Sequence, residues 1–390
     1  MSTTPVYPAR AVVDLDAIRD NVRALRTIAP TAQVMAVVKA DAYGHGLAPA
    51  ARAALAGGAT WLGAAQTREA LAARAAVGPG PRVLTWLYAP GAPFEDLVRA
   101  DVDIAVAAAW ALDEVADGAR AAGRGARVHL KVDTGLGRNG IMPGDLPGVL
   151  DRAAALQAEG SVSVVGVMSH FALADEPDDP SVKMQSHAFD EAIRAVEAAG
   201  LPVEVRHIAN SAATLTNPAT HHDLVRPGIA VYGLSPVPQL GAPGDYGLRP
   251  AMTLEARLAT VKRVPAGHGV SYGHFYTTAQ ETVLGVIPLG YGDGIPGTPP
   301  AARSARAGRS SSAAAWATSP HPTPGSAPPA CCASPGACAW TRSCSTWART
   351  LRSRPVTWSP CSGPRTGSPG PGRPTPRTGR RPRGPSATRS

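Results

Sequence analysis

Short apolar runs alternate with longer amphipathic stretches between residues 34 and 233. The amphipathic stretches, such as Thr67–Ala76 and Val182–Ala199, are rich in Ala, Leu, Glu and Arg, which favour helices. This alternation is typical of a parallel sheet with crossover helices. We expect strands near Val34–Ala40, Trp61–Ala65, Arg82–Leu87, Asp103–Ala107, Ala126–Asp133, Val164–Phe171, Val203–Asn210 and Leu224–Tyr232.

Eight such units within about 200 residues predict an α/β fold, a TIM (β/α)8 barrel, which we assign to residues 1–240. In a barrel of this kind the functional side chains stand at the C-terminal ends of the strands. A doubly wound open sheet is the alternative that the pattern by itself leaves open.

The pattern changes near Leu254. Residues 254–264 alternate between apolar and polar side chains, and no helix follows them. A second strand is expected at Thr282–Pro288, before the glycine-rich segment Gly290–Gly294. Because alternation is typical of a half-buried strand, residues 241–297 are expected to begin a mainly β C-terminal domain.

After Pro296 the periodicity disappears, and Ser, Pro, Arg, Ala and Gly dominate. Residues 298–390 contain 14 Arg, no Lys, Asp or Glu, and all five cysteines of the chain. Since the whole chain has a net charge of +9, residues 1–297 carry a net charge of −5. The basic average, which would suggest nucleic acid or a membrane surface as partner, therefore belongs to this last segment alone. Residues 1–297 have no thiolate for a disulfide or a metal site.

The N-terminal sequence Met1–Pro5 lacks the basic and apolar regions of a secretory signal. No apolar run is long enough to span a bilayer. We therefore expect a cytoplasmic protein, with no metal site and with neither membrane nor nucleic acid as partner.

The strongest chemical signal is Lys39, at the end of the apolar run Val34–Val38 and before a glycine-punctuated turn. Partial burial there would lower the pKa of the amine and make it nucleophilic, whereas a solvated lysine at a strand end is the simpler alternative. The ten residues from Val37 to Gly46 match, without a mismatch, the pyridoxal-phosphate attachment segment of alanine racemases. The chain thus resembles the pyridoxal-phosphate-dependent alanine racemase family over about residues 9–296.

The resemblance implies pyridoxal 5'-phosphate as the cofactor, attached to Lys39, with phosphate contacts from Tyr43, Ser211, Gly228 and Ile229. Ser211 follows the seventh expected strand, where a hydroxyl and exposed amides can hold a phosphate. Without the resemblance, a serine in this place would be interpreted as a helix cap.

By resemblance, Arg226 faces the pyridine nitrogen of the cofactor, while His207 and His170 orient Arg226 and stack near the ring. An arginine stays protonated and can only donate, so it disfavours protonation of that nitrogen. This suits a racemase, which must return a proton quickly. Taken alone, each histidine would be interpreted as a satisfied core residue.

Racemisation requires a proton to leave one face of Cα and arrive at the other, so two bases are expected. Lys39 is the first, and the resemblance implies that Tyr272, in Gly269–Gly273, is the second. Tyr272 acts in the family on the active site of the other subunit, which implies a homodimer. An isolated tyrosine in a β loop would otherwise be a packing residue.

The segment His129–Gly140 is a further matching block. It implies that Arg138 contacts the substrate carboxylate or the phenolic oxygen of the cofactor. It also implies that Lys131 corresponds to a lysine that is often carbamylated in the family and holds Arg138. A plain buried salt bridge of Lys131 is the alternative.

Residues 298–390 have two interpretations, a disordered basic tail or the product of a frameshift. If each true codon starts at the third base of the codon written, residues 333–348 are compatible with a family segment that contains Met-Asp. Residues 384–390 are then compatible with the segment that carries the phosphate-binding tyrosine. One lost base after the Pro296 codon would account for both, so we favour the frameshift and treat this low-complexity tail as disordered.

The sequence therefore predicts an isomerase that interconverts L- and D-alanine and supplies D-alanine for peptidoglycan. A broad-specificity amino-acid racemase and a cofactor-binding barrel without turnover are the alternatives. Because the Met-Asp segment and the phosphate tyrosine are missing as written, we expect negligible activity from this polypeptide and normal activity from the restored frame.

Overall fold

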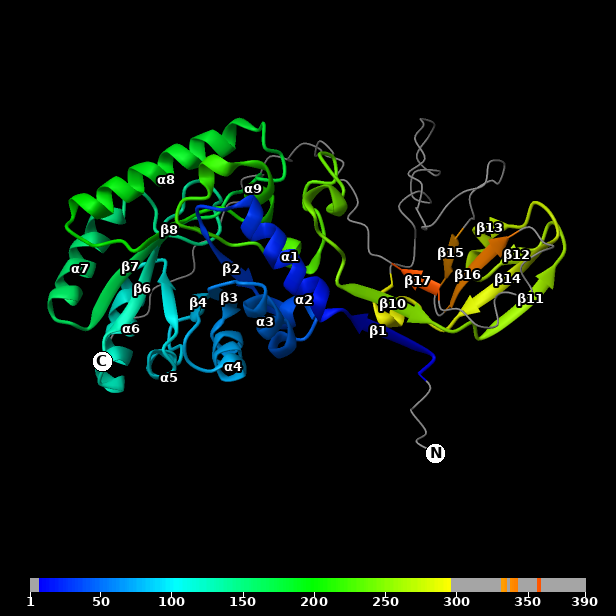
Figure 1. The fold of residues 1–390 in the computed structure, drawn as a ribbon, viewed down its shortest axis with the longest axis horizontal. Helices are drawn as coiled ribbons and strands as arrows, with labels where there is room; N and C mark the ends of the chain where they lie inside the picture. The colour runs from blue at the N-terminus through cyan, green and yellow to red at the C-terminus, as the bar shows by residue number, and fades with distance from the viewer. Residues whose placement is uncertain (1–6, 296–330, 335–336, 343–355, 359–390) are drawn as a thin grey trace, which may run out of the picture. The chain divides into compact units, whose positions relative to one another are not determined.

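The computed structural model describes residues 7–295, 331–334, 337–342 and 356–358 (Figure 1). Eight parallel strands form one sheet in the order β8-β7-β6-β5-β4-β3-β2-β9. Neighbouring strands are in register, with Met35 beside Trp61 and Leu62 beside Val83. The strands are β2 (Gln33–Val37), β3 (Trp61–Gln66), β4 (Arg82–Leu87), β5 (Asp103–Val106), β6 (Ala126–Lys131), β7 (Val162–Met168), β8 (Val205–His207) and β9 (Leu224–Val225).

Helices connect the strands and surround the sheet (Figure 1). The helices expected at Thr67–Ala76 and Val182–Ala199 are confirmed as α4 (Thr67–Val77) and α8 (Pro180–Ala198). The helices are α1 (Leu15–Ile28), α2 (Lys39–Gly44), α3 (Leu47–Ala56), α4 (Thr67–Val77), α5 (Phe94–Arg99), α6 (Ala109–Ala122), α7 (Leu146–Ala158), α8 (Pro180–Ala198) and α9 (Ser211–Thr216), and the 3₁₀ turns η1 (Pro218–Thr220), η2 (Ile229–Tyr232) and η3 (Pro243–Tyr246).

Backbone hydrogen bonds join the two ends of the sheet. The amide of Asp223 donates to the carbonyl of Arg206 at 3.2 Å, and the amide of Arg226 donates to the carbonyl of Ala209 at 2.9 Å. These bonds link the chain around β9 to the chain around β8, so the sheet is a nearly closed barrel. The predicted barrel is confirmed, and the open sheet is excluded.

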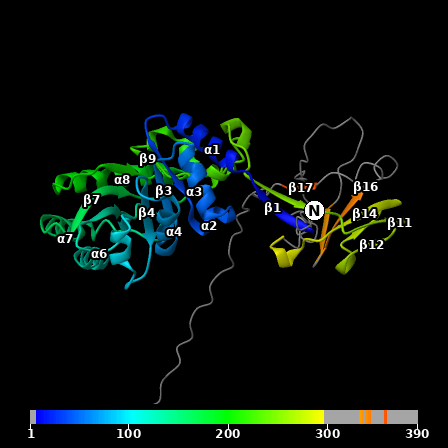
Figure 2. The same cartoon turned by 60° about the horizontal axis from the view of Figure 1, so that its bottom comes forward.

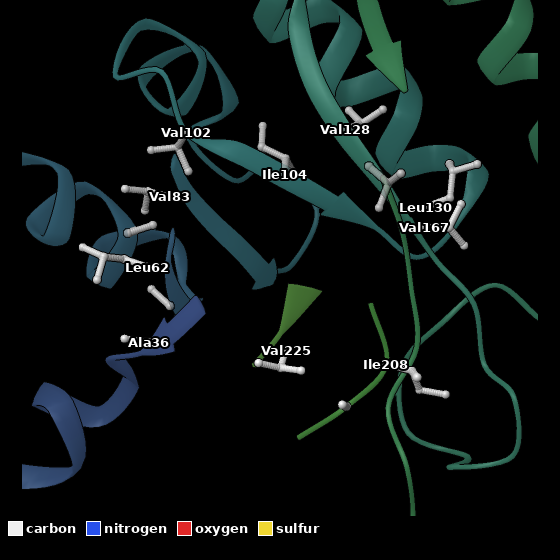
Figure 3. Close-up of a cluster of buried hydrophobic side chains, with 14 of the residues drawn as sticks. Ala36, Leu62, Val83, Val102, Ile104, Val128, Leu130, Val167, Ile208 and Val225 are labelled. Carbon is white, nitrogen blue, oxygen red and sulfur yellow. The ribbon is translucent and has the colours of Figure 1, made fainter. Parts of the chain in front are cut away.

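The core divides into two layers because successive strand residues face opposite sides of the sheet. Ala36, Leu62 and Val83 belong to the large cluster that packs under the helices, and Figure 3 shows these side chains on neighbouring strands. Met35 and Trp61, one position away, belong to a smaller separate cluster. This smaller cluster fills the inside of the barrel, where the polar side chains described below are also buried.

Several expected strands are shorter in the structure than in the prediction, and the strand expected at Val203–Asn210 is reduced to Val205–His207. The strand expected at Val34–Ala40 ends at Val37, because residues 40–43 adopt positive φ values and turn the chain into α2. The strand expected at Leu224–Tyr232 ends at Val225, since Pro227 has no amide hydrogen for a ladder and Ile229–Tyr232 forms η2.

The remaining described residues are mainly β, as predicted. Strand β1 (Ala9–Val13), which the prediction missed, pairs antiparallel with β10 (Met252–Ala256), and β10 also pairs with β17 (Val356–Trp358). A second sheet has the order β11-β14-β16-β15, of which β11, β14 and β16 are labelled in Figure 2. Its strands and the remaining short elements are β11 (Thr260–Val264), β14 (Thr282–Ile287), β16 (Ala337–Arg342), β15 (Cys331–Ser334), β12 (Gly269–Val270), β13 (Tyr276–Thr277), η4 (Tyr272–His274) and η5 (Tyr291–Asp293).

The alternating segment at 254–264 forms two strands rather than one. Residues 257–259 interrupt it because β10 pairs with β1, whereas β11 pairs with β14. The boundary expected at residue 240 stays a prediction. Apart from β15, β16 and β17, the tail predicted at 298–390 lies outside the described residues. Among the helices that the structure describes, none has the length and apolarity needed to cross a membrane.

Candidate active site

Lys39 stands at the C-terminal end of a barrel strand, as predicted. It is the first residue of α2, two positions after the end of β2, and its Nζ lies 5.6 Å from the centre of the Tyr43 ring. Burial and the positive charge of Arg138 lower the pKa of Lys39, while the negative charge of Glu69 opposes this shift. A larger fraction of the amine is therefore neutral, and hence nucleophilic, than in a solvated lysine.

A left-handed turn places Lys39 and Tyr43 near each other. Ala40, Asp41, Ala42 and Tyr43 have φ values between 51° and 56°, although none of them is glycine. Such residues cost about 1–2 kcal/mol each relative to the right-handed conformation. The turn is held by the amide of Ala40, which donates to Glu69 Oε1 at 2.8 Å, and by Asp41 Oδ1, which accepts from the amide of Leu47 at 2.7 Å. Strain that the surroundings enforce in this way is common at functional sites.

Tyr43, Ser211 and Gly228 converge next to this turn. Asn210, rather than Ser211, caps α9, since its Oδ1 accepts from the amide of Ala213 at 3.1 Å. Ser211 Oγ instead accepts from the amide of Gly228 at 2.8 Å and from the amide of Ala230 at 3.3 Å. Burial raises the pKa of Tyr43 to about 12, so its hydroxyl remains a donor. Hydroxyls and amides gathered like this can bind a phosphate.

Arg226 lies beside both predicted histidines. Its Nη1 donates to His207 Nδ1 at 3.0 Å, and its Nη2 donates to the carbonyl of Ser169 at 2.6 Å and to His170 Nδ1 at 3.2 Å. Burial lowers the pKa of Arg226 to about 9, so it is still a cation at neutral pH. Burial and the charge of Arg226 hold the pKa of both histidines well below their usual value. The arrangement is thus one protonated donor between two neutral imidazoles.

Lys131 is a buried amine at the end of β6. Its Nζ donates to the carbonyl of Asn139, and no described carboxylate lies within ion-pair distance of it. Burial, with the positive charges of Arg226 and Arg138, lowers the pKa of Lys131 to about 8. The buried salt bridge that we considered for Lys131 is therefore not found in the described part of the chain. Arg138 lies in the exposed loop after β6, and its charge acts on Lys39 as well as on Lys131.

Tyr272 stands outside this group of residues. It belongs to η4, and 68% of its surface is exposed. Tyr272 is thus exposed to solvent. The structure gathers the other predicted residues at the barrel site, namely Lys39, Tyr43, Lys131, Arg138, His170, His207, Ser211, Arg226, Gly228 and Ile229.

Sequence reasoning missed two buried polar residues inside the barrel, Asp103 and His129. Both are fully buried. Asp103 stands at the start of the otherwise apolar β5, and His129 lies between Val128 and Leu130 within β6. A polar side chain at an inward position of a barrel strand was the signal that could have found them, since such groups require partners.

The comparisons with known proteins agree with this geometry. The family model "Alanine racemase, N-terminal domain" matches residues 13–236, and "Alanine racemase, C-terminal domain" matches residues 251–309. The chain is 61% identical over 290 residues to the alanine racemase of Beutenbergia cavernae, covering 74% of this chain and 76% of that protein. It is 59% identical over 295 residues to that of Streptomyces coelicolor, covering 75% of each.

Solved structures give the same result. The alanine racemase of Streptomyces lavendulae superposes with a TM-score of 0.73 at 57% identity, covering 75% of this chain and 77% of that one. The alanine racemase of Bartonella henselae with covalently bound pyridoxal phosphate has a TM-score of 0.66 at 25% identity, covering 75% of this chain and 78% of that one. About a quarter of each of these relatives lies outside the match. Two family models and these relatives together show that the chain belongs to the alanine racemase family.

Proposed function

We propose that the barrel site binds pyridoxal 5'-phosphate through Lys39 and serves an alanine racemase that interconverts L- and D-alanine. The observation that carries this proposal is the position of a partly buried amine, whose pKa is lowered, beside hydroxyls and amides that can hold a phosphate and beside a buried arginine. The covalently bound cofactor of the Bartonella henselae relative supports it. The family to which the chain belongs supports alanine as the substrate.

The residues present fit this cofactor. A β-carbon at Gly228 would lie 2.3 Å from the Tyr43 hydroxyl, so the glycine leaves the space in which a phosphate could meet that hydroxyl. Tyr43, Ser211, Gly228 and Ile229 would hold the phosphate, and Arg226 would donate to the ring nitrogen. When bound, the cofactor would acidify the Cα–H bond of the substrate amine by withdrawing its electrons.

Lys39 would attach the cofactor and then serve as the base on one face of Cα. Its lowered pKa supplies the neutral amine that both roles need. Tyr272 of a second copy of the chain would exchange the proton on the other face. Its exposure leaves the hydroxyl free to reach another subunit, in keeping with a homodimer that shares its sites.

Arg226 would keep the ring nitrogen unprotonated, because a guanidinium donates and does not accept. The neutral His207 and His170 beside it cannot supply a second positive charge at neutral pH. Weak electron withdrawal favours rapid return of the proton over side reactions. This is the behaviour that racemisation requires.

Arg138 would bind the substrate carboxylate or the phenolic oxygen of the cofactor. Lys131 would support it as a carbamate, formed when the neutral amine attacks CO2 and releases one proton. The carbamate would add a negative charge close to Arg138 and Arg226, whose positive charges both act on Lys131. In this proposal the enzyme works in the cytoplasm and supplies D-alanine for peptidoglycan.

The frameshift that we propose after Pro296 would leave the barrel able to bind the cofactor but would remove residues that turnover needs. A barrel that binds the cofactor without turnover is therefore the second candidate function of the chain as written. The test compares the purified chain as written with the chain in the restored frame. Each is incubated with pyridoxal phosphate, reduced with borohydride and digested, and D-alanine formation is measured with D-amino-acid oxidase. We expect labelled Lys39 peptide from both and D-alanine from the restored chain only. Equal turnover would contradict the frameshift, and absence of label at Lys39 in both would contradict the proposed cofactor site.

A further inference from the structure

A chain of hydrogen-bonded side chains crosses the inside of the barrel from Asp103 to Arg226. His129 Nε2 lies 3.2 Å from Asp103 Oδ2, His129 Nδ1 lies 2.9 Å from His207 Nε2, and His207 Nδ1 lies 3.0 Å from Arg226 Nη1. The four residues come from β5, β6, β8 and the turn after β9. Asp103, His129 and His207 have no exposed surface, and Arg226 is 5% exposed. Water therefore cannot replace a missing partner in this chain.

The two ends of the chain fix the positions of its protons. A carboxylate can only accept, so His129 must carry a hydrogen on Nε2, and its Nδ1 must be bare if it accepts from His207. A guanidinium can only donate, so His207 must leave Nδ1 bare and carry its hydrogen on Nε2. The bond between the two imidazoles then runs from His207 Nε2 to His129 Nδ1. Because both ends require the same direction, every group in the chain has a partner.

Asp103 is itself held in place by two arginines from the neighbouring strands β4 and β6. Its Oδ2 accepts from Arg82 at 2.5 Å, and its Oδ1 accepts from Arg127 at 2.7 Å. Burial alone would raise the pKa of Asp103, but the hydrogen bond from His129, together with the hydrogen bond and charge of Arg82, outweighs it and keeps the pKa lowered. The acceptor at this end is thus a permanent carboxylate at neutral pH.

Gly166 on β7 provides the space for the pair of imidazoles. A β-carbon at this position would lie 2.2 Å from His129 Nδ1, the atom that faces His207. Any other residue would displace that ring. The glycine at this inward position of β7 is therefore required for the hydrogen-bonded chain from Asp103 to Arg226.

We infer that Asp103 and His129 are positioning residues which hold His207 in the one tautomer that can accept from Arg226, and so direct the guanidinium toward the site. The role of Arg226 toward the cofactor rests on the proposed function, whereas the tautomers of His129 and His207 do not depend on that function. The proton pattern is a property of the chain with or without cofactor. Its effect on catalysis is exerted entirely through Arg226.

The test is ¹⁵N NMR of the full chain labelled at histidine, with signals assigned from His129→Gln and His207→Gln. Both residues should show a protonated Nε2 and a bare Nδ1 near neutral pH, with and without added pyridoxal phosphate. A protonated Nδ1 at either residue overturns the inference. Failure of Lys39 to take up the cofactor would overturn the proposed function and leave this result unaffected.

Two variants test the direction of the effect. In Asp103→Asn the side-chain amide can donate or accept, so His129 should show mixed tautomers. The control is Asp113→Asn, which loses only the exposed ion pair with Arg152 and should leave the signals of both histidines unchanged. In Gly166→Ala, His207 should lose its single tautomer. The matched control is Gly63→Ala, whose β-carbon would lie 2.7 Å from Met35 Sδ and away from the hydrogen-bonded chain.

The restored-frame enzyme provides the catalytic readout. Asp103→Asn should lower kcat about tenfold or more, as the loss of an outer hydrogen-bond partner commonly does, with KM for alanine nearly unchanged. Unchanged kcat together with mixed tautomers would overturn the positioning role. If Gly166→Ala does not fold, the wild-type tautomers and the Asp103→Asn spectra still decide the matter.

Discussion

Gly228 and the Tyr43 hydroxyl are so close that a β-carbon on Gly228 would lie 2.3 Å from the hydroxyl oxygen. Tyr43 closes the left-handed turn that begins at Lys39, and Gly228 follows the last strand of the barrel. Two segments far apart in the sequence therefore meet at a point where neither tolerates added volume.

Gly228→Ala should weaken binding of pyridoxal phosphate about tenfold or more, which corresponds to about 1.4 kcal/mol. The added methyl group would displace the Tyr43 hydroxyl and occupy space that the phosphate needs. A fluorescence titration of the purified chain with the cofactor measures the change. Gly148→Ala, at an exposed helical glycine with nothing within 4 Å of the added carbon, is the control and should bind as the wild type does. Equal affinities of the two variants would refute the assignment of the cradle.

Ala40→Gly should stabilise the chain by up to about 1 kcal/mol, because glycine adopts a positive φ without the strain that alanine bears at 52°. Urea unfolding followed by circular dichroism measures this difference. Ala155→Gly, on an exposed position of the right-handed helix α7, is the matched control and should destabilise the chain by about 0.5–1 kcal/mol. Destabilisation by both variants would show that the turn is not strained at Ala40.

Lys131 should bind CO2 reversibly. Because its pKa is about 8, the neutral amine that reacts with CO2 becomes more abundant as the pH rises through this value. A carbamate signal should therefore appear in ¹³C NMR of the chain equilibrated with ¹³CO2 and grow over this range. Lys131→Met should lose the signal, and Lys183→Met, at an exposed position of α8, should keep it. No protein carbamate at any pH would exclude this role for Lys131.

Asp103 should make folding stability depend on pH in acid. The pKa of Asp103 in the folded chain lies below its value of about 3.9 in the unfolded chain. The stabilisation that the carboxylate contributes is therefore complete above a pH of about 3.9 and is lost as the pH falls through the pKa of the folded state. The difference in unfolding free energy between wild type and Asp103→Asn should therefore be largest near neutral pH and shrink in acid. Urea unfolding at a series of pH values tests this, and a constant difference would contradict it.

Much of the fold could be predicted because it depends on local pattern. Alternating apolar runs and helical stretches indicate eight βα units, and the Lys39 segment points to the family. The end of the strand before Lys39 could not be predicted, since the positive φ values after Lys39 are imposed by Glu69 and Leu47. The strand Ala9–Val13 was missed because its partner, Met252–Ala256, is distant in the sequence.

The sequence by itself determined the class of fold and the family and proposed the residues of the site, because residue type and spacing carry that information. Only the tertiary structure decided which groups meet. Asp103 and His129 are isolated polar residues in the sequence, yet closure of the barrel brings them into one line with His207 and Arg226. Since buried donors and acceptors must be satisfied across strands rather than along them, this proton pattern exists only once the barrel has formed.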